Sequence, residues 1–187
     1  LHALIAQNMP HLDVNAKMYP DMPVPADGDI GDFSDYNNRD FLVKKGCSTV
    51  NLVAGLYAIQ EFITTYHPAG EVPPQYRYCR NLQLDWNVRY GYYILEQINV
   101  VDNAIAPSEQ TVTVASTIKP KQWIQILNSY ADDLAERALI AEPEFMKNSL
   151  DGQVSDTNPD RLETFFRYRS EERRVGKECR LRWEAYV

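Results

Sequence analysis

The sequence holds few of the residues from which disulfide frameworks and metal sites are built. Its 187 residues include three cysteines and three histidines. Cys47 and Cys79 are far apart, and Cys179 lies near the end of the chain. Widely separated thiols form neither a disulfide framework nor a zinc pattern, so we expect buried, reduced cysteines. The histidines lack the two-histidine spacing of a helical zinc site. They are His2, His11 and His67.

Catalytic motifs and membrane-spanning segments are also missing. No apolar run approaches the roughly 20 residues that a membrane helix needs. There is no nucleophile elbow, no phosphate-binding glycine-rich loop and no calcium loop. Asp132, Asp133 and Glu136 cluster on a predicted helix, where a solvated face is the expected role. These absences favour a structural or binding protein over an enzyme, and they imply no cofactor and no membrane partner.

Positive charge is scarce as well. The formal net charge is −7, and without residues 169–187, which hold six basic and four acidic side chains, it is −9. Because binding to phosphate groups requires a basic surface, this acidic body argues against a nucleic-acid partner.

What is present indicates a globular fold with several well-marked elements. Hydrophobic residues make up 44% of the chain and aromatic residues 11%, which is enough for a packed core. Residues 50–53 and 56–66 are rich in β-formers on either side of Ala54-Gly55, so we predict a hairpin. A short helix is predicted from Ser34 to Val43, ended by Gly46.

Two main helices and further strands are predicted in the second half. For residues 76–99 we predict a long helix, whose wide aromatic stripe, including Trp86 and Tyr93, is typical of a core helix. A second helix is predicted over 120–139, beginning at Pro120. Its core-facing side chains are predicted to be Trp123, Leu127, Tyr130 and Leu134. Strands are predicted at 111–115, 145–154 and 162–168. The predicted fold class is therefore α+β (mixed α/β), with a small mixed sheet flanked by two main helices.

The chain divides into three regions by composition. Residues 1–35 are interpreted as the end of a preceding domain followed by a proline-rich connector, and residues 36–168 as one domain. Residues 169–187 resemble, through Cys179, the in-frame translation of a sequencing-adapter oligonucleotide, so we expect a non-native tail that adds nothing to the core. Because residue 1 is Leu, we expect an internal fragment of a longer protein.

The order of elements resembles a known family. Three stretches carry the likeness: residues 38–49, a short helix, a glycine and small polar residues before the hairpin; residues 63–66, which close the hairpin; and residues 156–162, between two strands. Because these three stretches occur in this order, residues 36–168 resemble the C-terminal domain of contractile tail sheath proteins of bacteriophages and related injection particles.

This resemblance implies a mechanical role. Sheath subunits form a helical assembly around an inner tube, and extended arms add strands to the sheets of neighbouring subunits. The implied partners are neighbouring sheath subunits, the tube protein, and a baseplate or tail terminator. The implied location is the virion tail, with the host cytoplasm during assembly. The interface residues expected to support the acceptor sheet are Tyr66, Leu162 and Phe165, beside a sheet edge at 56–66 or 162–168 that lacks a partner.

Two other functions are left open by the sequence. The chain could be an acidic protein-binding module of another family. It could also be a hydrolase that uses His67 with Asp85 or Asp102, although no motif supports that arrangement.

Overall fold

The computed structural model describes residues 12, 14, 15, 17–19, 35–66 and 77–169, together with the backbone of residues 178–186. It forms two compact units, Leu1–Leu84 and Asp85–Val187. Most of residues 1–35, with nearly all of the proline-rich connector, and His67 lie outside the described residues. The predicted division of the chain into a connector region at 1–35, a domain at 36–168 and a tail at 169–187 stays a prediction.

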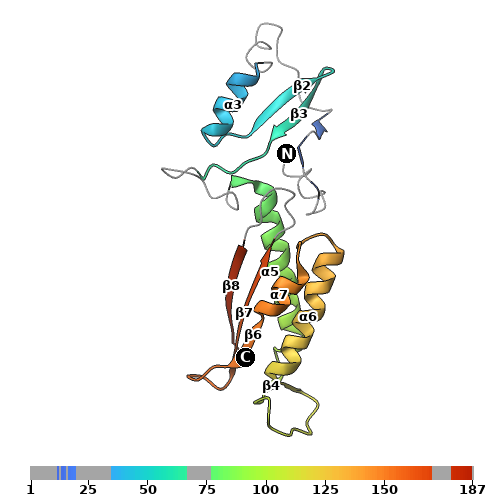
Figure 1. The fold of residues 1–187 in the computed structure, drawn as a ribbon, viewed down its shortest axis with the longest axis vertical. Helices are drawn as coiled ribbons and strands as arrows, with labels where there is room; N and C mark the ends of the chain where they lie inside the picture. The colour runs from blue at the N-terminus through green and yellow to red at the C-terminus, as the bar shows by residue number, and fades with distance from the viewer. Residues whose placement is uncertain are drawn as a thin grey trace. The chain divides into compact units, whose positions relative to one another are not determined.

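Among its described residues, the first unit contains helix α3 and a small antiparallel sheet (Figure 1). Helix α3 covers Tyr36–Lys44, and the Asp35 side chain caps it by accepting a hydrogen bond from the Asn37 amide. The helix ends before Gly46, which has a φ of +84° that favours glycine. The sheet contains β1 (Met18–Tyr19), β2 (Thr49–Val53) and β3 (Leu56–Glu61), in the order β1-β3-β2.

The predicted hairpin is confirmed by the antiparallel pairing of β2 with β3. Its two turn residues, Ala54 and Gly55, both have positive φ, as two-residue hairpin turns require. Val14, Tyr57 and Ile59 form the buried cluster beneath this sheet. The hydrophobic side chains of the hairpin therefore hold the first unit together.

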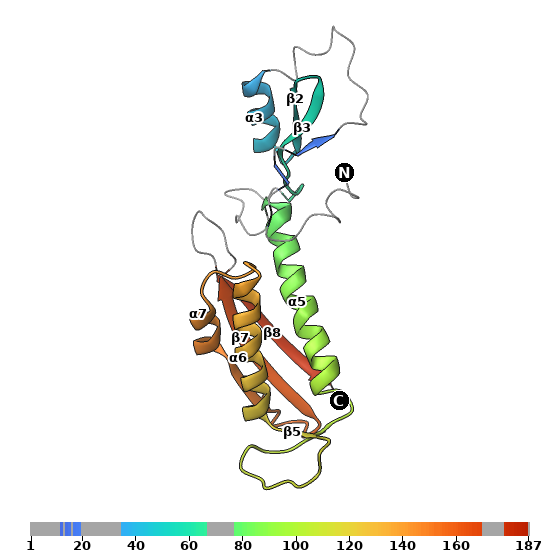
Figure 2. The same cartoon turned by 90° about the vertical axis from the view of Figure 1, so that its right-hand side faces the viewer.

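The described part of the second unit contains most of helix α5, helices α6 and α7, and a three-stranded antiparallel sheet. Helix α5 covers Cys79–Asn99, α6 covers Pro120–Glu136 and α7 covers Pro143–Ser149. The sheet contains β6 (Asp151–Val154), β7 (Arg161–Arg169) and β8 (Glu178–Tyr186), in the order β6-β7-β8. A parallel pair, β4 (Ala104–Ile105) and β5 (Thr117–Ile118), precedes α6. Figure 2 shows α5 and α6 running along this sheet. The predicted α+β class is confirmed.

The core of this unit lies between β7 and the helices. Alternate β7 residues are buried, from Leu162 to Tyr168, as the period of two in a strand requires. Phe166 contacts Tyr92, and Tyr92 meets Trp123 edge to face with ring centroids 5.7 Å apart. The Trp123 indole donates a 2.9 Å hydrogen bond to Thr164 Oγ1, which satisfies two buried polar groups together. All four predicted core residues of α6 are buried: Trp123, Leu127, Tyr130 and Leu134.

Gly91 allows α5 to approach α6 closely. The Tyr130 hydroxyl donates a 2.7 Å hydrogen bond to the Val88 carbonyl on α5. A methyl group on Gly91 would overlap that hydroxyl. Tyr130 is therefore the residue that requires a glycine at position 91.

We expect Gly91→Ala to lower the free energy of unfolding by about 1–3 kcal/mol, because the added methyl displaces Tyr130. In a Tyr130→Phe background, which lacks the hydroxyl, the same change should cost much less. Denaturant unfolding of the four proteins of this double-mutant cycle measures the coupling. An equal cost in both backgrounds would show that the Tyr130 hydroxyl is not the obstacle.

Two strand predictions are wrong. Residues 111–115 form no strand; the only pairing in this region is the two-residue β5 that follows them. Residues 145–154 divide into helix α7 and strand β6 instead of one strand. Pro143 starts that helix, and Ser149 ends it with a hydroxyl that bonds to both Met146 O and the Arg167 backbone. The change from helix to strand is thus fixed by a side-chain bond.

The expected free sheet edges are also corrected. Strand β8 pairs with β7 along its whole length, from Arg161↔Tyr186 to Arg169↔Glu178, although residues 169–187 were expected to add nothing. Strand β3 likewise lies between β1 and β2. Both segments predicted to be edges are therefore central strands, because in each case a flanking segment pairs with the backbone. The interpretation of 169–187 as adapter-derived stays a prediction.

Glu96 is a buried carboxyl on α5. One of its oxygens has no hydrogen-bond partner among the described residues, and burial raises the pKa of this carboxyl. A raised pKa in the folded state means that stability present at low pH is lost as the pH rises through that pKa. Glu96 therefore destabilises the folded protein at neutral pH.

We expect Glu96→Gln to raise the melting temperature at neutral pH, because it removes a buried charge. The difference from the wild type should shrink below the ordinary glutamate pKa of about 4.3. Thermal unfolding at several pH values tests this, with Glu136→Gln at an exposed position of α6 as the control. A benefit that does not change with pH would rule out charge as the cause.

Candidate assembly surface

Helix α5 presents an extensive apolar surface to solvent. Leu84, Val88 and Tyr92 are fully buried, but a second set of large side chains is exposed, including Trp86 at 63%, Tyr90 at 66% and Ile98 at 69%. We call this set the α5 apolar face. It consists of Trp86, Tyr90, Tyr93, Ile94 and Ile98.

This face carries no charge. Between Asp85 and Asn99, the exposed positions outside the apolar face are the amides Asn87 and Gln97. The charged residues of this stretch are Arg89 and Asp85, which pair with each other at 2.7 Å with side chains 43% and 20% exposed, and Glu96, which is buried. Exposed apolar patches on soluble proteins mark interaction sites, and Trp and Tyr are the side chains most enriched in the energetic centres of interfaces.

Part of this surface was predicted wrongly from the sequence. Trp86 and Tyr93 were assigned to the core because they share a wide aromatic stripe. The structure buries Val88 and Tyr92, which belong to the same predicted stripe, and leaves Trp86 and Tyr93 exposed. The signal that was missed is the width of the stripe. A helix that covers one sheet face buries only one side, so apolar residues around most of its circumference indicate that some of them are exposed.

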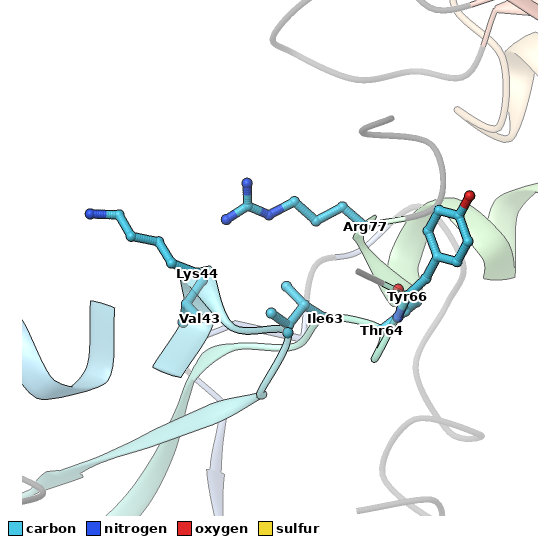
Figure 3. Close-up of a pocket in the computed structure, with 7 residues that line it drawn as sticks. Val43, Lys44, Ile63, Thr64, Tyr66 and Arg77 are labelled. Atoms are coloured by element: carbon cyan, nitrogen blue, oxygen red, sulfur yellow. Dashed lines mark hydrogen bonds between the residues drawn. The ribbon is translucent and has the colours of Figure 1, made fainter. Parts of the chain in front are cut away.

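Tyr66 lies in the first unit, just after β3. It is exposed and lines a shallow pocket of about 240 Å³ that opens to solvent, with Ile63, Thr64 and Arg77 also on its walls (Figure 3). Lys44 stands at its rim and pairs with Asp40 at 2.6 Å. A shallow pocket with few converging polar groups is a poor small-molecule site.

Leu162 and Phe165 lie on opposite faces of β7. Leu162 is only 1% exposed, so it supports the sheet from within and offers no surface. Phe165 is half-buried on the other face, beneath the Arg167 guanidinium at 5.5 Å from its ring centroid. The structure therefore does not bring these two side chains together, and their interface role stays a prediction.

The residues proposed for a hydrolase have other contacts. Asp85 forms an ion pair with Arg89 at 2.7 Å and accepts a hydrogen bond from the Tyr168 hydroxyl. Asp102 occupies a turn with a φ of +68°. Within the part of the chain that is described, no group of three or more His, Cys, Asp or Glu side chains could hold a metal ion. In the same residues, no helix is long and apolar enough to cross a membrane.

Comparison with solved structures finds a clear likeness. The crystal structure of a sheath tail protein from Desulfitobacterium hafniense superposes with a TM-score of 0.60 and 8% sequence identity, over 95% of this chain. The chain shares its fold with part of a sheath tail protein. It spans 37% of the length of that protein. No model of a protein family and no curated protein matches the sequence.

Proposed function

We propose that this chain is part of a structural subunit of a contractile tail sheath, which polymerises around an inner tube and contracts to drive injection. The observation that carries this proposal is the shared fold over 95% of the chain. The proposed partners are neighbouring sheath subunits and the tube protein, with a baseplate or tail terminator at the ends. The proposed location is the phage tail, after assembly in the host cytoplasm. The proposal involves no enzymatic activity.

The α5 apolar face supports this role. A subunit of a polymer must make contacts that outweigh the repulsion between identical charged copies. This chain has a net charge of −7, so contacts between its charged surfaces are opposed by like-charge repulsion. The uncharged aromatic face of α5 avoids that cost, and we assign its occupant as a neighbouring sheath subunit.

Open sheet edges provide a second kind of contact. In the three-stranded sheet of the second unit, β6 and β8 are the outer strands. The backbone of an outer strand can pair with a strand from another chain. Contacts that join different surfaces of successive copies produce helical filaments instead of closed oligomers. A sheath requires this type of growth.

An acidic protein-binding module of another family is the second candidate, favoured by the same exposed face. Such a module would bind one partner without forming filaments. A hydrolase is the third candidate, and it would lose activity on His67→Ala while remaining folded.

Co-sedimentation with the tube protein of the same particle separates these classes. We expect the protein to pellet with assembled tubes. Without tubes, we expect it to remain in the supernatant as monomers or small oligomers. Binding that saturates at one partner, with no pelletable assembly in any condition, would favour the binding module.

A further inference from the structure

The turn of the β2–β3 hairpin is strained. Its two central residues, Ala54 and Gly55, have φ values of +50° and +78°. Asn, Asp or Gly normally occupies the first of these positions, because the left-handed conformation is unfavourable for a residue with a Cβ atom unless its side chain bonds locally. Ala54 has the Cβ atom and no polar side chain. Observed strain of this kind indicates that the residue serves another purpose.

The same turn is apolar and exposed to solvent at the end of the hairpin (Figure 1). Val53 is 38% exposed, and a methyl group added to Gly55 would meet no described atom within 4 Å. Residues 52–59 contain no charged side chain. We call residues 53–55 the hairpin tip. Turns that face water usually carry polar residues, so a strained, apolar tip is suited to an apolar partner surface.

The α5 apolar face matches the hairpin tip in polarity and size. Neither surface carries a charge, in a chain whose net charge is −7, so two copies can approach there without like-charge repulsion. From Trp86 to Ile98 the face extends about 18 Å along the helix. The paired strands of a hairpin lie only about 5 Å apart, so the face is long enough to cover the whole tip.

The hydrogen-bonding groups of the two surfaces also match. The α5 apolar face has donors on exposed side chains, namely the Trp86 indole and the Tyr90 and Tyr93 hydroxyls. On the hairpin tip, the Ala54 and Gly55 carbonyls accept no backbone hydrogen bond from the described residues. Trp and Tyr usually donate to a partner when they are buried. Each surface therefore supplies the groups that the other would need on leaving water.

The exposed aromatic residues of α3 match the tip less well. Phe41 is 59% exposed, but the Lys45 ammonium lies over its ring at 5.6 Å from the centroid. Lys44 follows on the same helix and pairs with Asp40. Covering Phe41 would take charge out of water, which opposes binding.

We propose that the hairpin tip of one copy of this chain binds the α5 apolar face of the next copy. This inference rests on the proposed function, because neighbouring sheath subunits supply the second copy. The tip belongs to the first unit and the α5 apolar face to the second. Since the joined surfaces differ, the contact propagates from copy to copy, whereas two α5 faces that paired with each other would close into a dimer.

A mixture of two variants tests this contact. Ala54→Asp adds a charge to the tip and creates an Asp-Gly turn, which suits positive φ, so the fold should be retained. Tyr90→Glu adds a charge to the α5 apolar face. Each variant alone should self-associate at least about tenfold more weakly than the wild type, because its contact would bury an unpaired charge. Sedimentation velocity measures the association.

The mixture should restore a heterodimer. The intact tip of the Tyr90→Glu copy can bind the intact α5 apolar face of the Ala54→Asp copy. The remaining tip and the remaining face are both altered, so growth should stop at this pair. Ala54→Gly is the matched control, because it also suits the turn but adds no charge, and it should self-associate like the wild type.

Three results would overturn the proposal. The first is normal self-association of Ala54→Asp, which would also be the outcome if two α5 faces paired with each other. The second is a mixture that associates no better than its components. The third is a wild-type protein that stays monomeric up to about 1 mM, the limit of a weak specific contact.

The outcomes distinguish this inference from the function on which it rests. If Ala54→Asp forms sheaths on assembled tubes as the wild type does, the tip contact is wrong and the sheath role stands. If the mixture restores the heterodimer but no preparation assembles with the tube protein, the contact stands and the sheath role is wrong.

Discussion

Leu127→Ala is expected to lower the free energy of unfolding by about 2–5 kcal/mol, because it removes a fully buried side chain and leaves a cavity. Leu127 has no exposed surface and lies in the same α6 stripe as Trp123 and Tyr130. A loss of this size is a large share of the roughly 5–15 kcal/mol by which domains are stable. Urea denaturation followed by circular dichroism measures it.

The control for this prediction is Gln125→Ala on the exposed side of α6. A surface change of this kind should alter stability by no more than about 0.5 kcal/mol. If Leu127→Ala and Gln125→Ala lowered the free energy of unfolding by the same small amount, α6 would not face a packed core. The apolar stripe of α6 would then have to be reassigned as an interface.

Tyr90→Glu is expected to abolish assembly while leaving the fold intact. Tyr90 is 66% exposed at the centre of the α5 apolar face, so its replacement should change the free energy of unfolding by no more than about 0.5 kcal/mol. If this position contacts a neighbouring subunit, the new Glu side chain would bury an unpaired charge there. That burial would cost about 2 kcal/mol or more of binding free energy, which weakens binding by more than about tenfold.

Gln125→Glu adds the same charge at an exposed position of α6, away from the α5 apolar face, and controls for net charge. Sedimentation of both variants with the tube protein provides the comparison. Normal assembly of Tyr90→Glu would show that the α5 apolar face is not a subunit contact.

Helix α6 could be predicted from the sequence because several local signals agree there. Pro120 marks its start, the apolar period is 3.6 residues, and its charged residues fall on other faces. The β2–β3 hairpin was predictable for a similar reason, since Ala54-Gly55 favours a two-residue turn between runs of β-formers. In both cases the residues that form the element lie within a few positions of one another.

The failures involve partners that the sequence does not reveal. Residues 111–115 have the strand pattern, but a strand exists only where another backbone pairs with it, and none in the described chain does. Trp86 and Tyr93 have the residue types of a core, but the sheet covers only the side of α5 that carries Val88 and Tyr92. The candidate assembly surface is therefore visible only after the core has been assigned.

Electron microscopy of the protein mixed with the tube protein of its particle tests the central claim most directly. We expect helical sheaths around the tubes, in which the fold of residues 85–169 recurs at every lattice position and the α5 apolar face lies against a neighbouring subunit. Bare tubes beside dispersed or closed oligomers, in a preparation shown to be folded, would contradict it.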